Sequence, residues 1–277
     1  MTTVAQALRD AAARLADVSD TARLDAELMM EGALAMPRSA MLLRARDLAA
    51  PTAFTPMLAR RLGGEPVAYI MGRQDFYGRS FIVNPHVLIP RADSETIVEA
   101  ALPLCDADTR ILDCGTGSGA LLLTVVAERR GSHGIGVDAC PDAIGVAQAN
   151  ARALNLDHRV RMLERDWMLA DWCDGLGTFN LVLANPPYVK DAATLGPGVR
   201  EYEPARALFA GRDGLADYRA LLPHMDALLA PGGAAIIEIG HDQAAAVEAL
   251  AAQAGFTARL LRDLADRARG LVLRRRM

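Results

Sequence analysis

The four residues Asn185-Pro186-Pro187-Tyr188 follow the apolar run Leu181–Ala184 and could orient a planar amino group. A residue before a proline is pushed into an extended conformation, and each proline fixes its own φ and has no N–H. The Asn185 side-chain oxygen and the Pro186 carbonyl would then be two acceptors for the N–H groups of a planar –NH2, and the Tyr188 ring could lie on its flat face. A stiff turn at a strand end, which Asn and Pro also favour, is the alternative interpretation.

A second motif, DCGTGSGA at residues 113–120, has the composition of a nucleotide-binding loop. Glycines let the backbone approach a ligand closely at the N-terminus of a helix. Asp138 follows about 20 residues later, after the next expected strand, where its carboxylate could accept from both hydroxyls of a ribose. The candidate cofactor-binding residues of the loop are Asp113, Gly115, Thr116, Gly117, Ser118 and Gly119.

The glycine loop does not by itself identify its ligand. Gly115, Gly117 and Ala120 also satisfy a loose form of the dinucleotide fingerprint, so an NAD-dependent oxidoreductase stays open. Asp113 favours an amine-bearing ligand over a pyrophosphate, because a carboxylate pairs with positive charge. Later in the chain, Asp166 offers an acceptor for an adenine N6 amine and Trp167 an indole that could pack on the purine. S-adenosylmethionine has an amine, a ribose and an adenine, although a capped loop over a partly buried Trp would also explain Asp166 and Trp167.

The elements that must position these residues alternate from Arg110 onward. Strands are expected at Ile111–Cys114, Gly134–Asp138, Val160–Leu163, Leu181–Ala184, Ala235–Ile239, Thr257–Leu261 and Leu271–Arg274, with helical segments between them such as Ala143–Leu154 and Asp242–Ala254. This alternation predicts an α/β domain with a parallel, doubly wound sheet. Ligands of such sheets lie beyond the carboxyl ends of the strands, so we expect the motifs to converge on one edge.

The first part of the chain has a different character. Residues 1–73 are expected to be helical, with helices at Val4–Leu15 and Ala22–Leu34, and with Ser19-Asp20 as the N-cap of the second. Aromatic and β-branched residues around Gly78 favour a hairpin over residues 76–83. A helix at Asp93–Leu104 follows. We therefore predict a small helical domain at 1–73, a β-hairpin linker at 74–92 and an α/β domain at 93–277.

Composition limits the class of protein. The chain has 277 residues, 52% of them hydrophobic, and a net charge of −4, which argues against an electrostatic nucleic-acid binder. No apolar stretch approaches the roughly 20 residues of a membrane helix, and the N-terminus lacks the basic start and apolar core of a signal peptide. The four cysteines form no C-x-x-C pair, so we expect reduced thiols and no metal site. These features predict a soluble cytoplasmic protein.

The motifs DxGTGSG, GVD, ERDW and NPPY together resemble the class I, Rossmann-like methyltransferases that use S-adenosylmethionine to methylate planar amino groups. Among these, the chain looks similar to the bacterial release factor N5-glutamine methyltransferases, the HemK/PrmC family, over nearly its whole length. Further matching stretches are Gly64-Glu65-Pro66, Phe76-Tyr77-Gly78, Leu88-Ile89-Pro90-Arg91, Glu203-Pro204, Asp213-Gly214-Leu215 and Glu238-Ile239-Gly240. One departure is the stretch Arg91–Glu95, where the family usually has a proline and a Thr and this chain has Ala92.

The resemblance implies a seven-stranded methyltransferase domain and an N-terminal domain that docks the protein substrate. The substrate would be the glutamine of the Gly-Gly-Gln motif of class 1 peptide chain release factors, methylated on its side-chain nitrogen. Asn185, Pro186, Pro187 and Tyr188 would bind that amide and act as the catalytic residues, with Asn185 also next to the cofactor. An amide nitrogen is a poor nucleophile, so catalysis would depend on orientation and preorganised acceptors, with no strong general base in evidence. We expect a monomer that makes no direct contact with nucleic acid.

Three other functions stay open. A ribosomal-protein glutamine methyltransferase would use the same chemistry. A nucleic-acid adenine N6-methyltransferase also carries such an NPPY signature, but it should have a basic face, and residues 1–80 hold ten Arg against nine acidic residues. A non-catalytic cofactor-binding partner of the translation machinery is the third.

Overall fold

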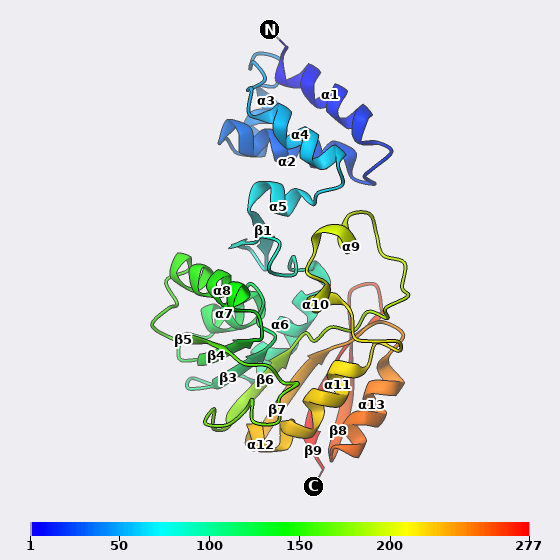
Figure 1. Cartoon of the computed structure of the whole chain (residues 1–277). Helices are drawn as coiled ribbons and strands as arrows, with labels where there is room; N and C mark the ends of the chain where they lie inside the picture. Colours follow the sequence, from blue (N-terminus) through cyan, green and yellow to red (C-terminus); the bar gives the residue numbers. More distant parts are fainter. Residues whose placement is uncertain (1, 277) are drawn as a thin grey trace. The chain divides into compact units, whose positions relative to one another are not determined.

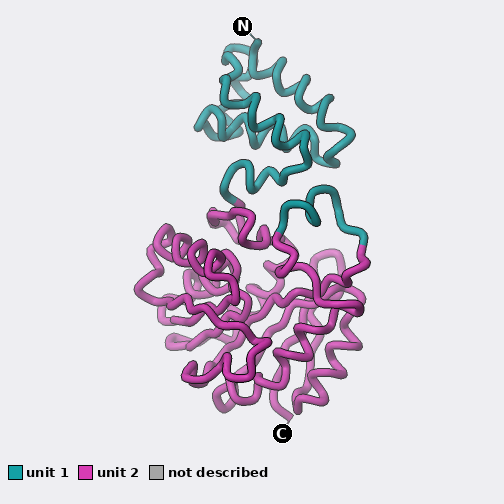
Figure 2. The backbone as a smooth tube through the Cα atoms, in the orientation of Figure 1, with its two compact units in different colours: residues 1–73, 194–203 teal, residues 74–193, 204–277 magenta. Residues whose placement is uncertain are grey.

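The computed structural model describes residues 2–276 (Figure 1). The chain forms two compact units, shown in different colours in Figure 2. One combines the chain up to Arg73 with Thr194–Glu203, and the other combines Gln74–Ala193 with the chain from Pro204 onward. Each unit has its own hydrophobic core.

The smaller unit is helical, as the sequence predicts. Its helices are α1 (Val4–Leu15), α2 (Ala22–Leu34), α3 (Arg38–Leu43), α4 (Phe54–Leu62) and α5 (Val67–Met71), and the segment Thr194–Glu203 contributes α9 (Val199–Tyr202). The Tyr202 hydroxyl donates to the Gly63 carbonyl at 2.8 Å, which ties that segment to the end of α4. The apolar sides of the helices meet in a core that includes Leu8, Met29 and Phe54.

The start of α2 differs from the expectation of a Ser19-Asp20 cap. The N-cap residue is Thr21, and its side chain makes no capping hydrogen bond. The Ser19 hydroxyl instead donates to Asp25 Oδ2 at 2.7 Å, and the buried Asp25 also pairs with Arg61 at 2.7 Å. The polar residues before the helix therefore donate hydrogen bonds to a buried carboxylate, because a buried charge without partners would be costly.

The larger unit is built on a seven-stranded sheet whose strands confirm the predicted ones. They are β3 (Arg110–Cys114), β4 (His133–Asp138), β5 (Val160–Glu164), β6 (Phe179–Ala184), β7 (Leu229–Glu238), β8 (Phe256–Arg262) and β9 (Ala268–Arg275), in the spatial order β5-β4-β3-β6-β7-β9-β8. β3 to β7 are parallel, but β9 is antiparallel to both β7 and β8. The expectation of a wholly parallel sheet is wrong here, because the short turn between β8 and β9 can only return the chain antiparallel.

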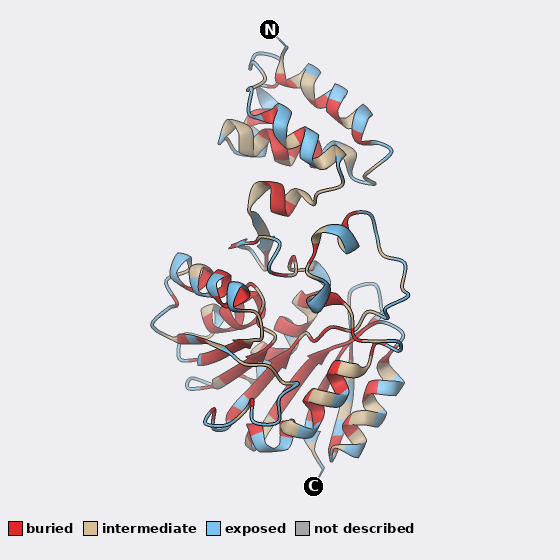
Figure 3. Cartoon of the chain, in the orientation of Figure 1, coloured by how far each residue is buried: buried red, intermediate tan, exposed pale blue. Residues whose placement is uncertain are grey.

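Helices cover both faces of the sheet, and its central strands are mostly buried, whereas the edge strands β5 and β8 are partly exposed (Figure 3). Alternate residues of each strand face opposite sides, so Leu181 and Leu183 lie in one core and Val182 and Ala184 in the other. The first core packs against α6 (Glu95–Ala101), α7 (Ala120–Glu128) and α8 (Pro141–Ala153), and the second against α11 (Ala216–Leu221), α12 (Met225–Leu228) and α13 (Ala244–Gln253). Short 3₁₀ turns occur at Ala92–Ser94, Leu102–Leu104 and Leu222–His224, and α10 spans Ala205–Leu208.

The predicted hairpin consists of β1 (Arg73–Phe76) and β2 (Arg79–Ile82). Tyr77 and Gly78 both have positive φ, 49° and 71°, as a two-residue turn between twisted strands requires. Asn150 of α8 holds β2, accepting from the Ile82 N–H at 2.7 Å and donating to its carbonyl at 3.0 Å. Within residues 2–276, no helix is long and apolar enough to cross a membrane.

Candidate active site

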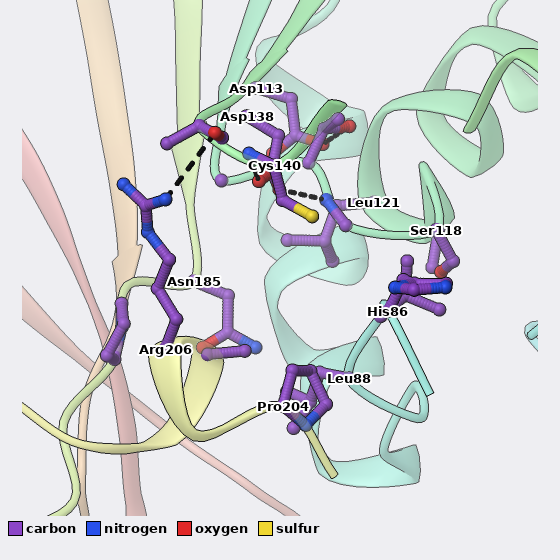
Figure 4. A pocket seen from close by; sticks show the side chains of 18 of the residues that line it. His86, Leu88, Asp113, Ser118, Leu121, Asp138, Cys140, Asn185, Pro204 and Arg206 are labelled. Atoms are coloured by element: carbon purple, nitrogen blue, oxygen red, sulfur yellow. Dashed lines mark hydrogen bonds between the residues drawn. The ribbon is translucent and has the colours of Figure 1, made fainter. Parts of the chain in front are cut away.

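A cavity of about 440 Å³ opens at the carboxyl edge of the parallel strands (Figure 4). The sequence-predicted residues that line it are Asp113, Gly115, Thr116, Gly117, Ser118, Asp138, Asp166, Trp167, Asn185 and Pro187. The other three predicted residues, Gly119, Pro186 and Tyr188, do not line it. The structure therefore brings together residues from the ends of β3, β4, β5 and β6, as expected for a doubly wound sheet.

The glycine loop joins β3 to α7 with a backbone that other residues adopt only with strain. Gly115, Gly117 and Gly119 have φ of 74°, 54° and 83°. A Cβ on Gly115 would lie 2.9 Å from the ring of Trp167, and one on Gly119 would lie 2.8 Å from Leu123. The glycines are thus needed for the loop conformation and, at Gly115, for the close approach of the indole.

Asp113 places a buried carboxylate at the floor of the loop. It is 1% exposed, and its Oδ2 accepts from the Thr116 hydroxyl at 2.7 Å. Its Oδ1 has no hydrogen-bond partner within residues 2–276. Burial raises the pKa of Asp113 to about 7. A buried carboxylate oxygen that lines a cavity and has no hydrogen-bond donor of its own is suited to bind the ammonium group of a ligand.

Asp138, at the end of β4, is held by backbone donors. Gly117 N–H donates to Oδ2 and Cys140 N–H to Oδ1, each at 2.9 Å. Burial raises the pKa of Asp138, while these bonds and the charge of Arg206 lower it. Each carboxylate oxygen keeps a further acceptor position, so the group is oriented in advance for hydroxyl donors.

Asp166 and Trp167 follow β5 and are each held by a partner from a helix. Asp166 Oδ1 accepts from the Met168 N–H at 3.0 Å, as a loop cap would, and Oδ2 pairs with Arg206 Nη2 at 2.5 Å. The Trp167 indole N–H donates to Asp217 Oδ1 at 3.0 Å. The two side chains line the cavity and also stabilise the loop, so the ligand-binding and structural interpretations are compatible.

Asn185 lies at the end of β6 and its side chain borders the cavity (Figure 4). No hydrogen-bond partner for that side chain is found in the described part of the chain. Pro186 and Pro187 are buried, and Tyr188 is half-buried. The Tyr188 hydroxyl donates to Glu238 Oε1 at 3.5 Å, and its carbonyl accepts from Gln243 Nε2 at 3.0 Å. The rigid backbone leaves the Asn185 amide available for a ligand.

Sequence reasoning missed two segments that contribute to the cavity wall. The first follows the hairpin and includes His86, Leu88 and Arg91, and the second contains Pro204 and Arg206 at α10. The stretches Leu88–Arg91 and Glu203-Pro204 did stand out as matches to a family pattern, but nothing local showed that they face a ligand. No group of three or more His, Cys, Asp or Glu residues in the range 2–276 could hold a metal ion.

Comparisons with known proteins identify the family. Residues 6–72 match the model of the PrmC N-terminal domain, and residues 105–260 match a model of a methyltransferase domain. The chain is 41% identical to the release factor glutamine methyltransferase of Caulobacter vibrioides, covering 95% of this chain and 93% of that protein. It is 40% identical to the protein of the same name from Moorella thermoacetica, covering 99% of each.

Solved structures support the fold alone. A methyltransferase from Pyrococcus furiosus matches with a TM-score of 0.53 at 16% identity, covering 79% of this chain and 98% of that one. A ribosomal protein L11 methylase from Lactobacillus delbrueckii subsp. bulgaricus matches with a TM-score of 0.51 at 20% identity, covering 70% and 84%. The resemblance inferred from the motifs is confirmed by the sequence relatives: the chain belongs to the release factor glutamine methyltransferases, and it is an enzyme of the S-adenosylmethionine-dependent methyltransferase class.

Proposed function

We propose that this chain transfers the methyl group of S-adenosylmethionine to the side-chain nitrogen of the glutamine in the Gly-Gly-Gln motif of class 1 release factors. The single observation that carries the proposal is the free Asn185 side chain beside a cavity that also contains the unpartnered carboxylate oxygen of Asp113. One site then offers an acceptor for a planar amide and an acceptor for an ammonium group.

The cavity residues fit the cofactor. Asp113 Oδ1 would accept from its amine, Asp138 from its ribose hydroxyls and Asp166 from the adenine N6 amine, with Trp167 against the purine. Gly117 has no Cβ, and no protein atom lies within 4 Å of the place that a Cβ would occupy. A ligand can therefore approach the backbone there. When bound, S-adenosylmethionine supplies an electrophilic methyl group on a positively charged sulfur.

Asn185 and Pro186 would activate the target nitrogen. The Asn185 side-chain oxygen and the Pro186 carbonyl would each accept one N–H of the glutamine amide, which turns the nitrogen lone pair toward the methyl group. The new N–C bond forms as the S–C bond breaks, and the proton then lost from the nitrogen passes to water. Orientation of this kind can contribute roughly 7–11 kcal/mol to lowering a barrier.

The helical unit would dock the protein substrate, as a domain at 1–73 separate from the hairpin linker at 74–92 and the catalytic domain at 93–277. We further propose that the enzyme is a cytoplasmic monomer that does not bind nucleic acid directly. Sedimentation measurements would test the monomer. Hydrogen exchange of the full chain should show protection within residues 1–73 when a release factor binds, and unchanged exchange there would refute the docking role.

Transfer of a labelled methyl group to purified release factors, with the site mapped by mass spectrometry, tests the reaction. Ribosomal proteins and DNA are the parallel substrates. Label on the Gly-Gly-Gln glutamine supports the proposal, whereas label only on a ribosomal protein or on DNA would keep the cofactor and overturn the substrate.

A further inference from the structure

A polar cluster lies around the buried Glu238 carboxylate and consists of Ser94, Tyr188, Glu238 and Arg269. Glu238, the last residue of β7, is 1% exposed, Ser94 is 4% exposed and Arg269 is 8% exposed. Ser94 also lines the cavity, so the cluster reaches the wall of the candidate active site. Of the four cluster residues, only Tyr188 has a role in the proposed reaction.

The cluster is not fully hydrogen-bonded. Glu238 Oε2, the Ser94 hydroxyl and Arg269 Nε are buried and have no hydrogen-bond partner among residues 2–276. The Ser94 hydroxyl still acts on Glu238 as a poorly aligned hydrogen-bond donor, and it lowers the pKa of Glu238, as does the charge of Arg269. Buried polar atoms are nearly always well paired, so a cluster with such poorly aligned contacts points to a role other than stability.

The segment from Glu238 to Gln243 holds Tyr188 by both of its polar ends. The Glu238 carboxylate accepts from the Tyr188 hydroxyl at 3.5 Å, and the Gln243 side chain donates to the Tyr188 carbonyl at 3.0 Å. This segment is itself fixed: the Glu238 carbonyl accepts from the Tyr218 hydroxyl at 3.0 Å, and Gln243 Oε1 accepts from the Gly240 N–H at 3.0 Å. The orientation of the Tyr188 ring is therefore set from the end of β7.

We propose that Glu238 is a positioning residue for methyl transfer: by accepting from the Tyr188 hydroxyl, it fixes the ring against which the target amide lies. The inference rests on the proposed function, in which Tyr188 contacts the glutamine. Glu238 does not line the cavity, so we expect it to touch neither substrate nor cofactor. Its effect should therefore fall on kcat and leave cofactor binding unchanged.

The charge of Glu238 gives this role a pH dependence. Burial raises its pKa to about 7, so the carboxyl changes its ionisation near neutral pH. A carboxylate accepts a stronger hydrogen bond than a neutral carboxyl group, so Tyr188 is held most firmly above that pH. The titratable or charged groups that face Glu238 or its partner Tyr188 are Arg91, Asp93, Tyr218 and Arg269, together with Asp263, which pairs with Arg269.

The test compares Glu238→Gln, Tyr188→Phe and the double variant with the wild type between pH 6 and 8, using methyl transfer to an intact release factor. Each single variant should lower kcat by about 3- to 10-fold at pH 8, the range expected for an ordinary hydrogen bond, because the contact is long at 3.5 Å. The double variant should be no slower than Tyr188→Phe. The rise of kcat with pH near 7 should be smaller in Glu238→Gln, and Glu248→Gln, a half-buried acid on α13, is the matched control.

Calorimetry and thermal unfolding separate positioning from a structural role. Unchanged affinity for S-adenosylmethionine and an unfolding temperature close to that of the wild type are expected for Glu238→Gln. Multiplicative losses in the double variant, or wild-type kcat at every pH, would overturn the inference while the proposed function stands. A wild type that transfers no methyl group to any release factor would refute both.

Discussion

Replacing Asp113 with Asn should weaken binding of S-adenosylmethionine and remove part of its dependence on pH. Asp113 Oδ1 has no hydrogen-bond partner in the described chain, and burial raises the pKa of this carboxyl to about 7. Such a group is ionised in about one molecule in eleven at pH 6 and about ten in eleven at pH 8. If the ionised form holds the ligand amine, the affinity contributed by Asp113 should rise about tenfold over this range.

The size of the effect at pH 8 follows from the bond that is lost. A hydrogen bond between charged partners contributes about 1.5–3 kcal/mol, so Asp113→Asn should raise the dissociation constant about 10- to 100-fold. At pH 6 the ratio of the variant and wild-type constants should be about tenfold smaller, because the wild-type carboxyl is then mostly protonated. The two dissociation constants should be compared as this ratio, because ionisation of the ligand amine affects both proteins equally and cancels.

Titration calorimetry at both pH values is the assay. Methylthioadenosine, which lacks the amino-acid part of the cofactor, should bind both proteins with similar affinity at both pH values. Asp157→Asn, at an exposed acid between α8 and β5 that does not line the cavity, is the control variant and should bind like the wild type. Wild-type affinity of Asp113→Asn at both pH values would refute the assignment of Asp113 to the amine.

The raised pKa of Asp113 also predicts how the stability of the cofactor-free protein depends on pH. The folded-state pKa of Asp113 is raised from 3.8 to about 7, so between these values the folded chain keeps a proton that the unfolded chain has lost. This contribution to stability is present below pH 4 and is lost as the pH rises toward 7. Asp113→Asn should therefore show a flatter unfolding temperature between pH 4.5 and 7.5, and a slope equal to that of the wild type would contradict the shift.

Four further variants test the site. Asn185→Ala should lower kcat by orders of magnitude and change cofactor affinity only slightly, because its amide orients the target; equal losses would indicate a structural role. Gly115→Ala and Gly117→Ala both place a side chain at positive φ, a cost of roughly 1–2 kcal/mol, but only the first meets Trp167, at 2.9 Å. Thermal unfolding without cofactor should therefore show a larger drop in unfolding temperature for Gly115→Ala, and equal drops would refute that contact's role. Arg206→Ala removes the ion pair with Asp166, in which 61% of the arginine side chain is exposed. Exposed ion pairs contribute only about 0–1 kcal/mol. Stopped-flow measurements should therefore show that the cofactor dissociates at most about fivefold faster. A much larger increase would mean that Arg206 contacts the ligand directly.

Local patterns in the sequence were sufficient for the elements and the central motifs. All seven strands and both long N-terminal helices lie where the periodicity predicts them. The glycine loop and Asn185 could be recognised because proline, glycine and strand-end effects act within a few residues of the chain. They meet at one edge because parallel strands align their carboxyl ends.

Only the tertiary structure decided what depends on packing between distant residues. The antiparallel direction of β9, the cavity residues His86 and Arg206, and the contact of Glu238 with Tyr188 across 50 positions have no local signature. The ionisation of Asp113 also depends on the tertiary structure. The sequence shows that the residue is an acid, but its pKa is raised because the folded chain buries it beneath the loop. Burial and pairing are properties of the folded surroundings, which residue type and spacing alone do not specify.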